Sequence, residues 1–296
     1  HRAFLARPLL GWGPENFSIA FNRFYNPALL VYSQSETWFD KPHNVLLEMA
    51  VAAGIPGLIA YLAIFVTVAA MAWRRFKTRE AALLLGGLGA YLGQNLFIFD
   101  TPNSLLLFFL MLALVGSGSQ RVGESESQKV IKSGRGAVAF SVFPITITLA
   151  AIAIYKINVQ PLQASSAYLQ AMVTAADQSP QRALPQFAIA LLLPTPYTWE
   201  PRTELAKLTT RMLLNGSVKP ENVPQLVNWV AGELENELLI HPREAYTYFL
   251  LGRLYTEAAL IDPSYFELAR VALDKSLELS PNRQQTLFGV AKLAIN

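Results

Sequence analysis

The sequence has 296 residues, of which 52% are apolar and only 15% are charged. This composition excludes an ordinary soluble domain, and it also excludes a chain that lies entirely within a membrane. The formal net charge of +3 arises in residues 1–159, whereas residues 160–296 carry 11 basic and 13 acidic side chains and offer no basic surface to nucleic acid. Cysteine is absent, which excludes disulfides, thiolate catalysis and cysteine-based metal sites. The chain begins at His1 without an initiator methionine, so we interpret it as the C-terminal part of a longer protein.

Residues 1–44 are predicted to form an extracytoplasmic loop that contains one short helix. Phe17, Phe21 and Phe24 recur at the i, i+4, i+7 spacing of a single helix face. This stripe favours a helix that lies in the membrane interface. An equally good interpretation is that the three rings pack against the membrane helices.

Four predominantly apolar stretches are long enough to cross a membrane as helices, at about residues 45–73, 81–99, 103–120 and 136–155. A turn that contains proline, residues 100–103, joins the second and third stretches and predicts a membrane hairpin. The sequence therefore predicts an all-α fold. A polytopic membrane domain over residues 45–158 is followed by a helical repeat domain over residues 160–296.

The loops between the predicted spans set the orientation. Residues 74–79 and residues 121–135 are rich in lysine and arginine, which places both loops on the cytoplasmic side. The loop at residues 40–44 and the repeat domain then lie on the extracytoplasmic face.

His43 and Asn44 lie where the N-terminal loop meets the first predicted span. Asp40 can cap that helix, with Pro42 in its first turn. A helix N-terminus favours a bound phosphate, because its free N–H groups and its dipole attract negative charge. The dipole also disfavours imidazolium, so His43 is a candidate general base, and Asp40 and Asn44 are candidate substrate-binding residues. The alternative is that His43 is only an interfacial anchor.

Three basic side chains flank this segment and are candidates for neutralising a diphosphate, namely Arg7, Arg23 and Lys41. The alternative for each is a contact with a lipid headgroup or a solvated charge. Asp100, in the turn between the second and third spans, is either a site carboxylate or, as we favour, a turn residue that faces solvent.

Residues 160–296 show apolar and small residues at helical spacing, with prolines between the helices. Several groups of residues match the spacing of tetratricopeptide helices: Tyr248, Leu251, Gly252 and Tyr255; Ala269, Leu273, Ser276 and Pro281; Ala183, Phe187, Ala190 and Pro194. A fourth group matches poorly: Val230, Leu234, Glu237 and Pro242. The sequence predicts a short tetratricopeptide-like array with a degenerate middle unit.

Three segments, RPLLGWGPENF (residues 7–17), DKPHNVLLEMAVAAGIPGLIAYL (40–62) and FIFDTPNSLLLFFLMLAL (97–114), resemble the C-terminal part of the O-antigen ligase and O-antigen polymerase superfamily. The resemblance covers roughly residues 4–118, and the His43-Asn44 pair with Gly54-Ile-x-Gly57 is its most specific part. Members of this superfamily with a C-terminal tetratricopeptide domain also occur.

The resemblance implies a multi-pass enzyme of the bacterial cytoplasmic (inner) membrane. Such enzymes take a glycan from an undecaprenyl-diphosphate carrier and transfer it to a lipid A core, a glycan or a protein, with no cofactor and no metal. The essential histidine of the family falls on His43, which would remove a proton from the acceptor hydroxyl during an inverting displacement. The repeat domain would then bind an acceptor, a nascent glycan or a partner protein.

Two other functions remain open at this point. One is a protein O-oligosaccharyltransferase that uses the same fold and histidine. The other is a membrane-anchored scaffold for glycan assembly that has no catalytic activity.

Overall fold

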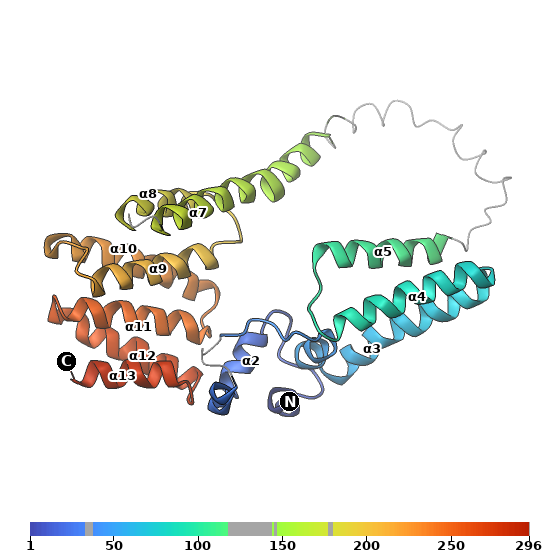
Figure 1. Ribbon diagram of the computed structural model, residues 1–296, viewed down its shortest axis with the longest axis horizontal. Coiled ribbons are helices and arrows are strands. Elements are labelled where there is room, and N and C mark those ends of the chain that lie inside the picture. The colour runs from blue at the N-terminus through green and yellow to red at the C-terminus, as the bar shows by residue number, and fades with distance from the viewer. Residues whose placement is uncertain (33–37, 118–143, 145–146, 177–179, 296) are drawn as a thin grey trace. The chain divides into compact units, whose positions relative to one another are not determined.

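The computed structural model, shown in Figure 1, describes residues 1–32, 38–117, 144, 147–176 and 180–295. Every regular element among these residues is helical, which confirms the predicted all-α class. The chain divides into two compact parts, His1–Ser133 and Gly134–Asn296, which we name unit 1 and unit 2.

Unit 1 contains α1 (Arg2–Ala6), α2 (Phe17–Arg23), a short 3-10 helix (Pro27–Val31), α3 (Val45–Arg75), α4 (Thr78–Asn95) and α5 (Pro102–Ser117). Helices α3, α4 and α5 contact one another (Figure 1). Each contributes one aromatic ring to a shared core: Phe65 from α3, Tyr91 from α4 and Phe108 from α5. The rings of Tyr91 and Phe108 stack with their centroids 4.5 Å apart, so aromatic packing holds the three helices together.

Only α3, among the residues that the structure describes, is both long and apolar enough to cross a membrane, over Val45–Arg74. Pro102–Gly116 is a shorter apolar helix. Helix α4 ends at Asn95, so the predicted second span, 81–99, extends too far by residues 96–99. Half of the predicted fourth span, 136–155, lies outside the described residues, and residues 147–154 are helical. A four-span topology therefore stays a prediction.

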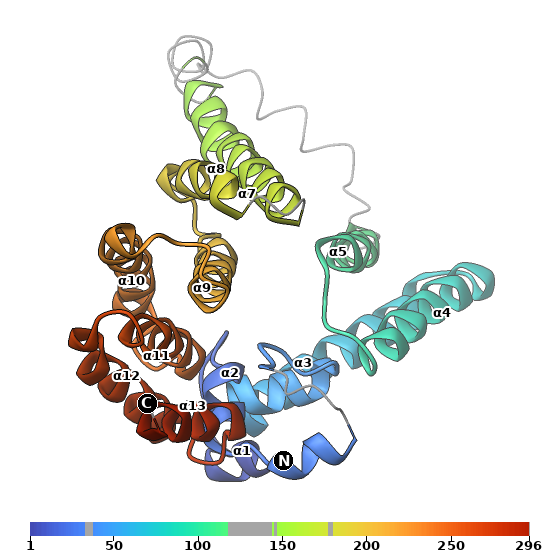
Figure 2. The same cartoon turned by 60° about the vertical axis from the view of Figure 1, so that its left-hand side comes forward.

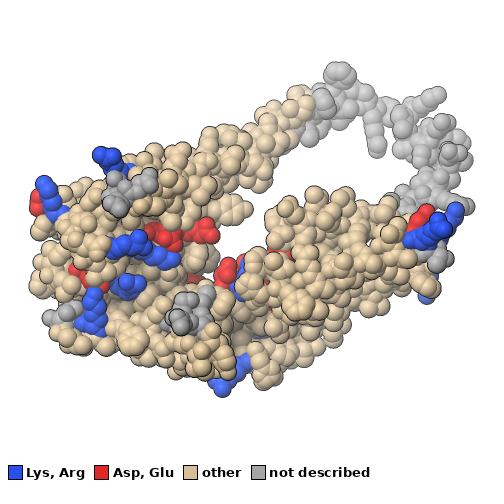
Figure 3. Space-filling model, in the orientation of Figure 1, with Lys and Arg blue, Asp and Glu red and all other residues tan. Residues whose placement is uncertain are grey.

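The surface of unit 1 fits a membrane location for α3. On the face shown in Figure 3, charged side chains gather near its two ends, with uncharged surface between them. Lys77 lies in the turn between α3 and α4, Arg79 lies in the first turn of α4, and Asp40 lies in the segment before α3. In between, α3 exposes apolar side chains, including Ile59 (61% exposed) and Val66 (69% exposed). Such a band is suited to contact with lipid.

A break near its start divides α3 into residues 45–53 and residues 55–75. Gly54 has φ +66° and ψ −164°, a backbone conformation that glycine alone adopts readily. Pro56 follows, and it lacks the N–H that would bond to the Ala52 carbonyl in an unbroken helix. The expected first span, 45–73, is therefore two helical segments rather than one.

Residues 8–13 use the backbone groups that the break releases. Three backbone hydrogen bonds join residues 8–13 to α3: Trp12 N to Val51 O (2.8 Å), Gly13 N to Ala52 O (2.9 Å) and Ile55 N to Pro8 O (2.8 Å). The backbones approach so closely that a Cβ atom on Gly54 would lie 2.5 Å from Leu9 O. The N-terminal segment thus replaces hydrogen bonds that the helix itself does not make.

The aromatic side chains of α2 pack inward. Phe17 and Phe24 lie against a small core formed by Ala3, Ala20 and Val51. Packing against neighbouring helices is therefore confirmed for Phe17 and Phe24, two rings of the phenylalanine stripe, whereas a position in the membrane interface stays a prediction.

Unit 2 contains one π-helical turn (Tyr155–Val159), α7 (Gln160–Ala176), α8 (Pro180–Leu192), α9 (Trp199–Leu214), α10 (Val223–Ile240), α11 (Ala245–Ala259), α12 (Phe266–Leu279) and α13 (Gln284–Ile295), with 3-10 turns at Pro220–Asn222 and Pro263–Tyr265. Figure 2 shows that consecutive helices pair as antiparallel hairpins, which follow one another along the unit. Helix α7 continues directly from the π-helical turn.

Burial in unit 2 follows the spacing identified in the sequence. Ala269, Leu273 and Ser276 of α12 are fully buried, and so is Phe187 of α8. Gly252 of α11 lets α12 approach closely, because a Cβ atom there would lie 2.6 Å from Leu273 Cγ. The predicted helical character of residues 160–296 is confirmed for the described part of that range, while the tetratricopeptide assignment stays an interpretation.

The poorly matching middle group contains a buried ionic network. Glu237 of α10 is 2% exposed, and its carboxylate lies 2.7 Å from Arg202 of α9. Arg202 also lies 3.1 Å from Glu233, and the second oxygen of Glu237 lies 2.7 Å from His241 Nδ1. A carboxylate at this interior position needs these partners, which explains why the local sequence departs from the repeat pattern.

Candidate active site

The start of α3 is set by Asn44. Its backbone is extended (φ −163°, ψ 111°), and its Oδ1 accepts a hydrogen bond from Leu47 N at 2.9 Å. The same side chain donates from Nδ2 to Leu96 O, also at 2.9 Å, and so ties the start of α3 to the end of α4. The predicted cap, Asp40, is wrong, because the helix begins at Val45 and Asn44 occupies the capping position.

His43 lies immediately before this cap and is exposed. Two aromatic rings contact its imidazole: Phe39 edge-on, with centroids 6.4 Å apart, and Phe99 at 5.5 Å. Phe99 belongs to the connection between α4 and α5. The imidazole is therefore positioned by one ring from the segment before it and one from the connection between α4 and α5, and its exposed side stays accessible to a substrate.

Several charged groups surround the same helix end. Glu48, half-buried in the first turn of α3, interacts electrostatically with Lys41, Glu15, Asp40 and Asp100. The amino group of Lys41 lies 3.4 Å from a carboxylate oxygen of Glu15 in a largely exposed ion pair. Such a pair is weak and can be exchanged for another anion. Asp40 is exposed.

The two predicted arginines lie on other elements. Arg7 follows α1, and its guanidinium lies over the Trp12 ring, 4.3 Å from the centroid. Arg23 lies in the last turn of α2 and is exposed. Arg7 thus directly precedes residues 8–13, which bond to the break in α3. The ring contacts of His43 come instead from Phe39 and Phe99.

Asp100 is not the solvent-facing turn residue that we favoured. It is only partly exposed, and its Oδ1 accepts hydrogen bonds from Tyr91 Oη (2.5 Å), Asn95 Nδ2 (3.0 Å) and Ser104 Oγ (3.4 Å). Because Asp100 directly follows Phe99, this network fixes the segment that contacts His43. Polar residues within apolar stretches are a signal for such a site.

The buried polar atoms near Asp100 are not all satisfied by protein groups. Asn95 Oδ1 and Tyr61 Oη are both buried and have no hydrogen-bond partner among the described residues. In the same part of the chain, no group of three or more His, Cys, Asp or Glu side chains is placed to hold a metal ion. The site therefore consists of one imidazole, a helix N-terminus, exchangeable surface charges and a partly buried network around the Asp100 carboxylate.

Residues 2–62 match the family model of O-antigen ligases. The match includes α1, α2, His43 and the break in α3, whereas Phe99 and the network around Asp100 lie outside it. Comparison with curated proteins and with solved structures gave no match. The family match and the long apolar helix together indicate a membrane-bound, glycan-ligating activity of the glycosyltransferase kind.

Proposed function

We propose that this protein transfers or polymerises a glycan from an undecaprenyl-diphosphate carrier onto an acceptor at the extracytoplasmic face of a bacterial cytoplasmic membrane. The observation that carries the proposal is the exposed His43 at the start of α3, within the segment that matches O-antigen ligases. A histidine at the aqueous end of a membrane helix can act on a substrate whose carrier lies in the lipid.

In the proposed reaction the imidazole of His43 takes the proton of an acceptor hydroxyl. The acceptor oxygen forms a bond to the anomeric carbon of the donor. The bond from that carbon to the lipid diphosphate breaks, and the configuration inverts. The reaction needs no metal, because the leaving diphosphate meets cationic side chains and a helix N-terminus instead.

Support for the leaving-group site comes from the geometry of α3. The dipole of its first segment favours negative charge beside Asn44. Lys41, three residues before the cap, adds a mobile positive charge. Glu48 opposes an anion at this end, so Lys41, the basic side chain that interacts with Glu48, is assigned to offset its charge.

The repeat unit is proposed to hold an acceptor, a nascent glycan or a partner protein outside the membrane. Successive helical hairpins offer extended surfaces for such binding.

The proposal is tested by measuring the donor pool, which is the amount of glycan that the cells hold on undecaprenyl diphosphate. Cells that lack the protein should accumulate glycan on undecaprenyl diphosphate, because the carrier is no longer discharged. Mass spectrometry of extracted lipids measures this pool, and the restored wild-type gene provides the control. An unchanged donor pool, together with unchanged surface glycan, would contradict the proposed transfer.

The orientation can be tested with single cysteines, because the chain has none of its own. Cysteines at Tyr32 (90% exposed) and Ser217 (exposed) should react with an impermeant thiol reagent in intact cells. A cysteine at Lys77 should react only after the membrane is opened, because its loop is basic. The reverse pattern would place His43 on the wrong side for an extracytoplasmic donor.

A further inference from the structure

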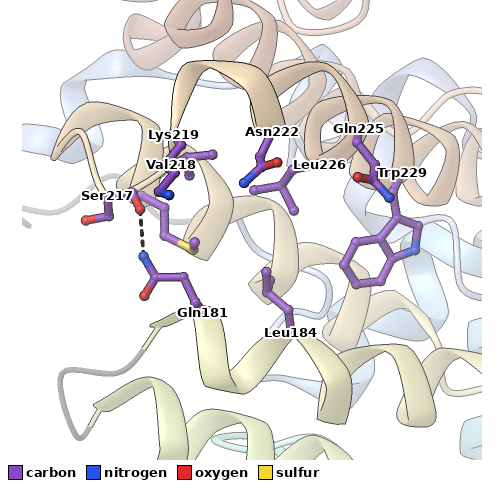
Figure 4. Close-up of a pocket in the computed structure, with 10 residues that line it drawn as sticks. Gln181, Leu184, Ser217, Val218, Lys219, Asn222, Gln225, Leu226 and Trp229 are labelled. Carbon is purple, nitrogen blue, oxygen red and sulfur yellow. Dashed lines mark hydrogen bonds between the residues drawn. The ribbon is translucent and has the colours of Figure 1, made fainter.

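A cavity of about 500 Å³ lies within unit 2, between α8, the end of α9 and the start of α10. Figure 4 shows residues from these elements facing a common space. This volume lies within the range of small-molecule sites, roughly 300–1,000 Å³. The cavity is separate from the site at His43, because all of its lining belongs to unit 2.

The lining combines an apolar part with neutral amides. Leu184 and Leu226 contribute apolar surface, and Trp229 presents a partly exposed indole. Asn222 and Gln225 are exposed amides on the same wall (Figure 4). None of the ten residues that line the cavity is acidic, and one, Lys219, is basic. The cavity therefore suits a neutral or acidic ligand that is rich in hydroxyl groups.

One side of the cavity is held in place by local bonds. Gln181 Nε2 of α8 donates to Ser217 O at 2.6 Å, and this bond is drawn in Figure 4. Ser217 N donates to Met212 O at 2.9 Å, and Gly216 adopts φ +61° just after α9. These contacts fix the segment that carries Lys219, so the ligand would meet a largely formed site.

The chemistry of the lining distinguishes a sugar from a peptide as the ligand of the cavity. Each amide both donates and accepts hydrogen bonds, as each sugar hydroxyl does, and an indole face packs on the apolar face of a pyranose ring. A peptide that binds by strand addition would need a strand edge, which the described residues do not offer, and an amphipathic helix would need a continuous apolar groove. Here amides and a lysine interrupt the apolar surface.

From these observations we infer that the cavity binds a segment of an oligosaccharide, neutral or acidic. The indole of Trp229 packs on a sugar ring, and the amides of Asn222 and Gln225 bond to its hydroxyl groups. The inference rests on the proposed function for the source of that oligosaccharide, which is the glycan that the enzyme transfers or extends.

Binding is measured on the full chain in detergent micelles. The probe is the set of oligosaccharides that mild acid releases from the lipid-linked pool of cells making the protein, each labelled with fluorescein at the reducing end. Fluorescence anisotropy should show saturable binding. Substituting both Asn222→Ala and Gln225→Ala should weaken binding about tenfold, because up to four hydrogen bonds are lost.

Two further variants keep the result interpretable. The matched control carries Gln163→Ala and Gln170→Ala, two exposed amides on α7 outside the cavity, and should bind within about twofold of the wild type. Trp229→Phe preserves apolar packing and should weaken binding several-fold, while circular dichroism stays unchanged. Absence of binding by the wild type, or equal binding by the Asn222 and Gln225 variant and its control, would overturn the inference.

Binding and transfer measured side by side distinguish a failure of this inference from a failure of the proposed function. A protein that binds the oligosaccharides but leaves the donor pool unchanged in deletion cells would retain the cavity assignment and reject transfer. If the cavity variants bind the oligosaccharides normally and transfer glycan with an unchanged KM for the acceptor glycan, the cavity assignment alone would be rejected.

Discussion

Replacing His43 by alanine is expected to lower the rate of glycan transfer by at least about 100-fold, because a positioned general base typically contributes 10²- to 10⁴-fold. The abundance of the protein in the membrane should stay nearly unchanged, since the side chain is exposed and its ring contacts within the described part of the chain are two, with Phe39 and Phe99. Transfer is measured as loss of glycan from the lipid-linked pool in membranes that contain the full protein.

His241→Ala is the matched control. His241 is also an exposed histidine near a helix end, but it lies after α10 in unit 2, and Arg202 still pairs with Glu237 when the imidazole is removed. Transfer should stay within about twofold of the wild type in this variant. Wild-type transfer by the His43→Ala protein would show that the general-base assignment is wrong.

Replacing Gly54 by alanine is expected to destabilise unit 1 by about 3 kcal/mol or more. The backbone at this position has φ +66°, and the added Cβ would meet the carbonyl of Leu9. Segment 8–13 would then separate from α3, and residues 45–53, which end at the break, would lose their fixed direction. Because His43 precedes these residues, transfer should also fall.

The control for this substitution is Gly86→Ala on α4. A Cβ atom at Gly86 meets no described atom within 4 Å, and its backbone is helical, so alanine should be neutral or slightly stabilising. Thermal unfolding in detergent measures both variants, with a decrease in Tm of roughly 6 °C or more expected for Gly54→Ala. Equal Tm values for the two proteins would mean that the close approach at Gly54 does not support the fold.

The features that sequence reasoning predicted well are local ones. Burial of Ala269, Leu273 and Ser276 followed from helical spacing, because a hairpin brings residues together that are close in the chain. His43 and Asn44 were placed at a helix start for the same reason. The capping residue was misassigned, since both Asp40 and Asn44 are good caps and only the backbone conformation decides between them.

The features that sequence reasoning missed depend on distant contacts. Gly54 and Pro56 signal a possible kink, but the segment that stabilises it lies about forty residues earlier. The network around Asp100 likewise needs the relative rotation of α4 and α5, which apolar composition does not specify. The cavity in unit 2 joins residues from three helices and was not recognised at all.

The way residues 8–13 close against α3 also bears on how such a chain can diversify. The bonds that fix the break use only residues 8–13 and 51–55, while the stretch from residue 27 onward is largely outside that contact, with Val31 81% and Tyr32 90% exposed. Replacements in residues 27–32 would therefore be tolerated without displacing His43. A chain built in this way can vary the composition of this stretch while the break in α3 keeps its hydrogen bonds.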